Sequence, residues 1–211
     1  MRRRNFIRSL SIGSGAIVAT PAISIPAVAN TISKTRTAKE LPTDVVIAGA
    51  GMGGCAAAIA ALRNGLRVVM TEETDWIGGQ LTQQGLSCPD EHPWIESFGA
   101  TQLYSDLRTA IREYYVRHYP LTEAAKTNKN LNPGSGAVSR LCHEPRVALA
   151  VLSNMLAPYL ASGKLTLLLQ HKIEGADING DKVKALKAHS LQTGDKIILT
   201  APYFIDATEL G

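Results

Sequence analysis

Two short apolar segments, separated by an alanine-rich stretch, define the first part of the pattern along the chain. Asp44–Ala48 and Arg67–Thr71 are nearly continuous apolar runs, which is typical of strands buried on both faces of a parallel sheet. The stretch between them, Cys55–Asn64, predicts a helix that Gly65 closes. The order strand, helix, strand predicts a βαβ unit and therefore an α/β fold with a parallel sheet.

Helical periodicity dominates the middle of the chain. Apolar residues spaced three and four apart predict an amphipathic helix from about Gly99 to Tyr119. The polar segment Leu121–Arg140 predicts a surface loop, and a second helix is expected from Pro145 toward Leu160, since proline is tolerated in a first turn. Together these segments predict a helical insertion over about residues 95–160.

Beyond Gly163, short strand-like segments replace the helical period. Turns are expected at Asn179-Gly180 and at Thr193-Gly194-Asp195. The expected strands are Leu165–Leu169, Lys182–Ser190 and Lys196–Ala201. They indicate an antiparallel β-meander, after which Tyr203–Asp206 returns toward the parallel sheet.

The excess positive charge lies entirely in the first 29 residues. The formal net charge is +4, with 22 basic and 18 acidic side chains, and residues 1–29 contain four arginines and no acid. Without those four arginines the basic and acidic counts are equal. The remaining chain therefore gives no electrostatic reason to expect a nucleic-acid partner.

The N-terminal segment predicts an export signal. Arg3–Arg8 resembles a twin-arginine motif, an apolar stretch follows, and Ala27-Val28-Ala29 is a small-x-small cleavage pattern. We expect residues 1–29 to be a twin-arginine signal peptide cleaved after Ala29, and residues 30–42 to be a linker. The expected partner is the twin-arginine export machinery, and the expected location is the periplasm or the extracellular space. An ordinary secretory signal is the alternative, because its first segment is also basic.

Glycines and prolines interrupt the apolar stretch of the signal before it reaches the about 20 residues that span a bilayer. Stable membrane insertion is therefore not expected.

A glycine-rich motif follows the first apolar segment. Gly49-Ala50-Gly51-Met52-Gly53-Gly54 matches G-x-G-x-x-G between a buried strand and a helix. In that context the first glycine permits a tight turn, Gly51 lets the backbone approach a diphosphate, and Gly54 allows close helix–strand packing. The diphosphate would lie at the positive end of the helix. A glycine-rich turn without a ligand is the alternative.

An acidic residue ends the second predicted strand. Glu72 lies 23 positions after Gly49, where a carboxylate can accept hydrogen bonds from the ribose hydroxyls of an adenosine. A carboxylate there also disfavours the 2′-phosphate of NADP. The adjacent Glu73 is the alternative ribose ligand, and strand alternation does not separate the two.

A second glycine turn, Gly78-Gly79-Gln80, follows shortly after the acidic strand end. A nicotinamide dehydrogenase has no need of it, whereas a flavoprotein uses a second backbone turn against the diphosphate or ribityl chain. A plain Gly-Gly turn is the alternative for this segment taken alone.

With these motifs, Thr43–Gly211 resembles the FAD-dependent oxidoreductase family, which is of glutathione-reductase type and includes xanthan-lyase-associated proteins. The resemblance implies a Rossmann-like FAD/NAD(P)-binding βαβ domain with a parallel sheet, inserted helices and an antiparallel β-meander. It implies that Ile173 turns its backbone toward the adenine, and that Asp206-Ala207-Thr208 on the returning strand belong to the FAD site. Glu209 departs from the family pattern, which has glycine after Asp-Ala-Thr.

The resemblance implies that a small-molecule substrate, not identified by the sequence, passes hydride to FAD. Because related flavoproteins continue into a substrate domain, we expect a fold that is incomplete at the C-terminus, from truncation or in a degenerate copy. An NAD-binding dehydrogenase and a non-catalytic remnant are the alternative functions. No catalytic residue and no metal ligand are assigned, since the five histidines are isolated. Cys88 and Cys142 could pair in an oxidising compartment, but the sequence cannot show their proximity.

Overall fold

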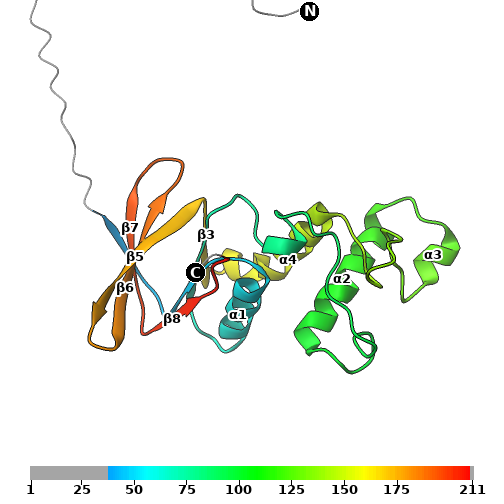
Figure 1. Ribbon diagram of the computed structural model, residues 1–211, viewed down its shortest axis with the longest axis horizontal. Coiled ribbons are helices and arrows are strands. Elements are labelled where there is room, and N and C mark those ends of the chain that lie inside the picture. The colour runs from blue at the N-terminus through cyan, green and yellow to red at the C-terminus, as the bar shows by residue number, and fades with distance from the viewer. Residues whose placement is uncertain (1–37, 210–211) are drawn as a thin grey trace, which may run out of the picture. The chain divides into compact units, whose positions relative to one another are not determined.

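The computed structural model describes residues 38–209, so the expected signal peptide and most of the expected linker lie outside the described residues. A four-stranded parallel sheet is the centre of the fold (Figure 1). Its strand order is β4-β3-β2-β8, formed by Leu165–Leu169, Val68–Glu72, Val45–Ala48 and Tyr203–Asp206. All four residues of β2 are buried, which explains its uninterrupted apolar sequence.

Helices cover one face of this sheet. The helix α1 (Met52–Arg63) follows β2, and α4 (Pro145–Ala161) precedes β4. Val45 and Ile47 of β2 point to this face and share a core cluster with residues of α1, α4 and α2 (Gln102–His118). The expected amphipathic helix and the expected helix from Pro145 are thus both present.

A second, mixed sheet lies against the opposite face. Its order is β1-β7-β6-β5, formed by Lys39–Pro42, Lys196–Thr200, Lys182–Ser190 and His171–Asn179. Val46 of β2 and Val69 of β3 pack against Ala188 and Leu199 of this sheet. Consecutive residues of β2 therefore contact different layers, as the two-residue period of a strand requires.

The structure corrects the end of the expected linker. Lys39–Pro42 is not part of a tether but forms β1, which pairs in parallel with Ile197–Thr200 of β7. Only Leu41 of β1 is partly buried, and the other three side chains are exposed. The segment therefore has the polar sequence of a linker, although its backbone is paired within a sheet.

Two further differences concern the insertion and the meander. The expected loop Leu121–Arg140 contains a short helix, α3 (Glu123–Thr127). Leu165–Leu169 pairs in parallel with β3 and not with the meander, which consists of β5, β6 and β7. The strand β5 is largely exposed, so its sequence has little of the apolar pattern by which a strand is recognised.

Within residues 38–209, no helix is both long enough and apolar enough to cross a lipid bilayer.

Candidate cofactor-binding site

The turn after β2 packs so tightly against neighbouring backbone that two positions, Gly49 and Gly54, have no space for a Cβ atom. Gly49 has φ +93°, and a Cβ atom there would overlap the carbonyl group of Ala207. A Cβ atom on Gly54 would overlap the carbonyl group of Gly49. The roles expected for these two glycines, a tight turn and close helix packing, agree with this geometry.

The first turn of α1 has no side-chain cap. Gly51 is the N-cap, its backbone is extended, and neither a side-chain cap nor an acidic residue of the first turn is present at this helix end. Met52, Gly53 and Gly54 form that turn. Free backbone N–H groups at a helix start, with the positive end of the helix dipole, favour a phosphate.

The second glycine turn lies directly against the first. The N–H of Gly78 donates a 2.7 Å hydrogen bond to the carbonyl of Ala50. Gly78 and Gly79 both have positive φ, and Gly79 begins the short 3₁₀ helix η1 (Gly79–Leu81). A Cβ atom on Gly79 would lie 3.2 Å from the Cα of Gly51. The two turns therefore face each other through bare backbone.

A carboxylate lies between these two turns. The Oε1 atom of Glu209 is 2.8 Å from the position of a Cβ atom on Gly51 and 2.6 Å from that on Gly79. This is the position expected for the diphosphate, so the carboxylate oxygen stands where a phosphate oxygen would lie. Sequence reasoning noted Glu209 only as a departure from the family and did not place it here.

Glu72 joins the end of β3 to the glycine loop. Its Oε2 atom accepts a 2.9 Å hydrogen bond from the N–H of Ala50. Its Oε1 atom accepts hydrogen bonds from the N–H of Thr74 at 3.0 Å and from its hydroxyl at 2.9 Å. Glu73 instead lies 3.7 Å from the ammonium group of Lys172. Of the two candidates for the ribose ligand, Glu72 is therefore the one attached to the glycine loop.

The returning strand β8 brings Asp206 beside Ala48 of β2. The carboxylate of Asp206 accepts hydrogen bonds from the N–H of Thr208 at 3.0 Å and from its hydroxyl at 2.7 Å. These bonds lower the pKa of Asp206, the backbone bond most strongly, so its carboxylate is ionised at neutral pH. The N–H of Ala207 donates a 2.7 Å hydrogen bond to the carbonyl of Ala48, which fixes this turn beside the glycine loop.

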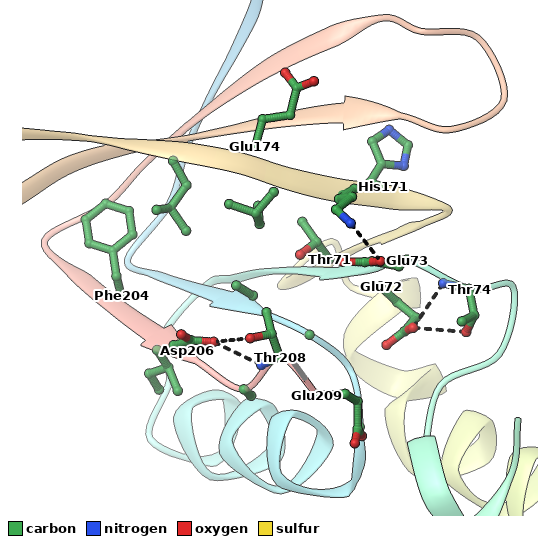
Figure 2. Close-up of a pocket in the computed structure, with 18 of the residues that line it drawn as sticks. Thr71, Glu72, Glu73, Thr74, His171, Glu174, Phe204, Asp206, Thr208 and Glu209 are labelled. Atoms are coloured by element: carbon green, nitrogen blue, oxygen red, sulfur yellow. Dashed lines mark hydrogen bonds and ion pairs between the residues drawn. The ribbon is translucent and has the colours of Figure 1, made fainter. Parts of the chain in front are cut away.

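A cavity of about 760 Å³ opens between the carboxyl ends of the parallel strands and the meander. Figure 2 shows His171 and Glu174 on the meander side, and Asp206, Thr208 and Glu209 on the side of α1. The expected site residues that line it are Gly49, Gly51, Glu72, Ile173, Asp206, Ala207 and Thr208. Those that do not line it are Met52, Gly53, Gly54, Gly78, Gly79 and Gln80.

Several lining residues were not anticipated as site residues. The polar ones lie mainly on β3 and β5, and the apolar ones on β6 and β8. They include Thr71, Thr74, His171, Lys172, Glu174, Val183, Leu186 and Phe204. The only sequence signal for the meander side was the place of Ile173 before the Asn179-Gly180 turn, because β5 carries no motif.

A comparison with protein families decides between the flavin and nicotinamide alternatives. A family profile described as FAD dependent oxidoreductase matches residues 44–211. The chain belongs to the FAD-dependent oxidoreductase family. The match confirms the expected family and its cofactor, FAD, and it favours the flavoprotein over an NAD-binding dehydrogenase.

Solved structures align with this chain at low sequence identity. Sdh1 of Mycobacterium smegmatis aligns with a TM-score of 0.51 and 17% identity, over 81% of this chain and 34% of that chain. A geranylgeranyl bacteriochlorophyll reductase-like protein from Thermoplasma acidophilum aligns with a TM-score of 0.47 and 14% identity, over 80% and 39%. L-proline dehydrogenase from P. horikoshii aligns with a TM-score of 0.43 and 16% identity, over 82% and 23%.

The alignment with Sdh1 confirms the Rossmann-like α/β fold class. The chain spans about a third of the length of Sdh1. No match is found among curated protein sequences.

Proposed function

We propose that residues 44–209 hold the adenosine and diphosphate of FAD in an exported oxidoreductase. The observation that carries this proposal is the pair of facing glycine turns at the start of α1. A diphosphate needs backbone N–H groups that it can approach closely, and Gly51 and Gly79 have no side chains of their own to keep it away. A nicotinamide dehydrogenase has no need of the second turn.

The space between the Gly51 and Gly79 turns, here called the cradle, fits a diphosphate if the Glu209 side chain moves away. Its side chain is exposed and flexible, and it is the only group that a Cβ atom on Gly51 would approach within 3.4 Å among the described residues. The carboxylate therefore occupies the cradle without being built into it.

The adenosine would extend from the cradle into the cavity. A carboxylate can accept about four hydrogen bonds, and Glu72 uses three on Ala50 and Thr74. Acceptor capacity is thus left for a ribose hydroxyl. Beyond Glu72 the cavity reaches Ile173 on β5, where the adenine would lie.

In the whole protein we propose that a small-molecule substrate is oxidised by hydride transfer. Bound FAD supplies the hydride acceptor. The residues described here position the cofactor: the start of α1 compensates the diphosphate charge, and Glu72 fixes the ribose. Within residues 38–209, we assign a catalytic role to no side chain.

The test is to purify the whole protein, denature it, and identify the released cofactor by absorbance and mass spectrometry. We expect a flavin spectrum and the mass of FAD. Release of FMN would contradict the adenosine site, because FMN has no adenosine. Release of NAD would contradict the flavin assignment.

We further propose that the protein is exported through the twin-arginine route, with cleavage after Ala29. Arg3–Arg8 and Ala27-Val28-Ala29 support the proposal. That route carries folded proteins, which suits a protein whose cofactor must be inserted before export.

A further inference from the structure

Two of the three cysteines, far apart in the sequence, are neighbours in the structure. Cys88 lies between η1 and α2, and Cys142 lies shortly before α4. The N–H of His143 donates a 2.8 Å hydrogen bond to the carbonyl of Ser87. The Cys142 side chain lies close enough to the Cys88 thiol to raise its pKa. One backbone hydrogen bond thus joins the residue before Cys88 to the residue after Cys142.

This contact brings the backbones of the two cysteines close together. The carbonyl carbon of Ser87 is bonded to the nitrogen of Cys88, and the nitrogen of His143 to the carbonyl carbon of Cys142, so the hydrogen bond links groups adjacent to both cysteines. Disulfides form at Cα separations of about 4.4–6.8 Å. We propose that Cys88 and Cys142 form a disulfide that ties the segment following η1 to the segment preceding α4.

The surroundings of Cys142 hold its thiol in place. Its N–H donates a 2.7 Å hydrogen bond to Oδ1 of Asn132, and its carbonyl accepts a 2.8 Å bond from the N–H of Gly134. The thiol itself lies 3.6 Å from the carbonyl of Ser139. Cys142 is buried whereas Cys88 is partly exposed, so an oxidant would reach Cys88 first.

The third cysteine provides an internal control. Cys55 is fully buried beneath the glycine loop, where its thiol donates a 3.3 Å hydrogen bond to the carbonyl of Ala50. Burial raises the pKa of Cys55 to about 12, and the nearby charge of Glu72 adds to the effect. This thiol should resist oxidation while the protein is folded.

The reaction is a thiol–disulfide exchange with a small-molecule disulfide such as oxidised glutathione. The Cys88 thiolate attacks one sulfur of that disulfide, which forms a mixed disulfide and releases one glutathione thiolate. The Cys142 thiolate then attacks the sulfur of Cys88 and releases the second. Two protein thiols lose their protons and two electrons, and one glutathione disulfide becomes two glutathione thiols.

The Cys88 thiol is not activated for this reaction. Burial raises its pKa, and the neighbouring Cys142 raises it further. The reactive thiolate is therefore a small fraction at neutral pH, and the rate of oxidation should increase by up to about tenfold per pH unit as the pH rises toward that pKa.

The test is to equilibrate the whole protein with reduced and oxidised glutathione, block free thiols with N-ethylmaleimide, and map the peptides by mass spectrometry. We expect one Cys88–Cys142 peptide pair and alkylated Cys55. The same mixture with the protein unfolded in urea should give at least about tenfold less of this pair, because the fold no longer holds the thiols together. Equal yields in the folded and unfolded protein, or linkage through Cys55, would overturn the proposal.

A second measurement uses the melting temperature. Because the bond closes a loop that contains α2 and α3, oxidation should raise Tm by roughly 5–10 °C. Cys88→Ala should abolish this increase and Cys55→Ala should retain it. An equal increase in the Cys88→Ala variant would show that the oxidant acts elsewhere. The peptide map of the unaltered protein decides the question even if a variant fails to fold.

Discussion

The N–H of Ala50 donates a 2.9 Å hydrogen bond to Oε2 of Glu72, so the glycine loop after β2 is held by the end of β3. The carbonyl of the same residue accepts a hydrogen bond from Gly78. One alanine in the glycine loop thus joins the three segments that contribute to the proposed diphosphate and ribose site. The arrangement leads to specific expectations for single substitutions.

Glu72→Ala should lower the affinity for FAD at least about tenfold, because a hydrogen bond to a charged group contributes about 1.5–3 kcal/mol. The substitution removes both the proposed ribose contact and the acceptor of the Ala50 N–H. The measurement is a titration of the apoprotein with FAD, followed by flavin fluorescence.

Glu73→Ala is the matched control, since its ion pair with Lys172 is half exposed and such pairs contribute about 0–1 kcal/mol. A larger loss of affinity for Glu73→Ala than for Glu72→Ala would assign the ribose to the other carboxylate.

Gly51→Val should abolish FAD retention while the protein stays folded. A Cβ atom at this position approaches only the flexible side chain of Glu209, but it would fill the space of the diphosphate. Gly53→Ala is the control, because a Cβ atom there has no described atom within 4 Å. Gly54→Ala should instead lower Tm, since its Cβ atom would overlap backbone. Normal flavin content in purified Gly51→Val would refute the site.

Glu209→Gln should increase the affinity for FAD by roughly 3- to 10-fold at low ionic strength, and the gain should shrink as salt is added. The physical reason is the removal of a negative charge from the cradle between Gly51 and Gly79. Glu113→Gln on α2 controls for the change in net charge. Weaker binding by Glu209→Gln would show that the carboxylate contributes to the site.

Arg108→Ala should destabilise the protein by about 3–5 kcal/mol, because it leaves the partly buried carboxylate of Glu91 without its ion-pair partner and removes one of the two arginines that bind Glu96. Arg108 is 2% exposed and forms ion pairs with Glu91, at 2.8 Å, and with Glu96. Urea unfolding measures the change. Arg117→Ala, whose ion pair with Glu113 is exposed, should alter stability by less than about 1 kcal/mol.

The destabilisation by Arg108→Ala should also depend on pH. Burial alone raises the pKa of Glu96, but hydrogen bonds from Arg112 and Arg108 outweigh burial and lower it. The pKa of Glu91 is lowered in the same way. A carboxyl group whose pKa is lower in the folded state stabilises the fold above its unfolded pKa, and this contribution is lost as the pH falls. The difference from the unaltered protein should be full at neutral pH and shrink below pH 4.5.

Replacement of Arg3 and Arg4 by lysine should leave the precursor inside the cell, because the twin-arginine receptor reads paired arginines. An ordinary secretory signal accepts lysine, so unimpaired export would favour that route. Mass spectrometry of the exported protein should find Asn30 at its N-terminus.

The sequence by itself determined the βαβ unit and the identity of its key residues. The buried strand, the glycine pattern and Glu72 are close together in the chain, and each is specified by local requirements. Uninterrupted apolar residues are needed for burial on both faces, and glycine is needed where a Cβ atom has no space. The helices from Gln102 and Pro145 could likewise be predicted, because their apolar spacing and first-turn residues are also local features of the chain.

Only the tertiary structure decided how distant segments meet. It places Lys39–Pro42 in a sheet with β7 and Leu165–Leu169 beside β3. It also brings Cys88 next to Cys142, and Glu209 between Gly51 and Gly79. The composition of a segment limits whether it can form a strand, but not which strand it pairs with. That choice depends on packing and register between residues far apart in the chain, which no local pattern contains.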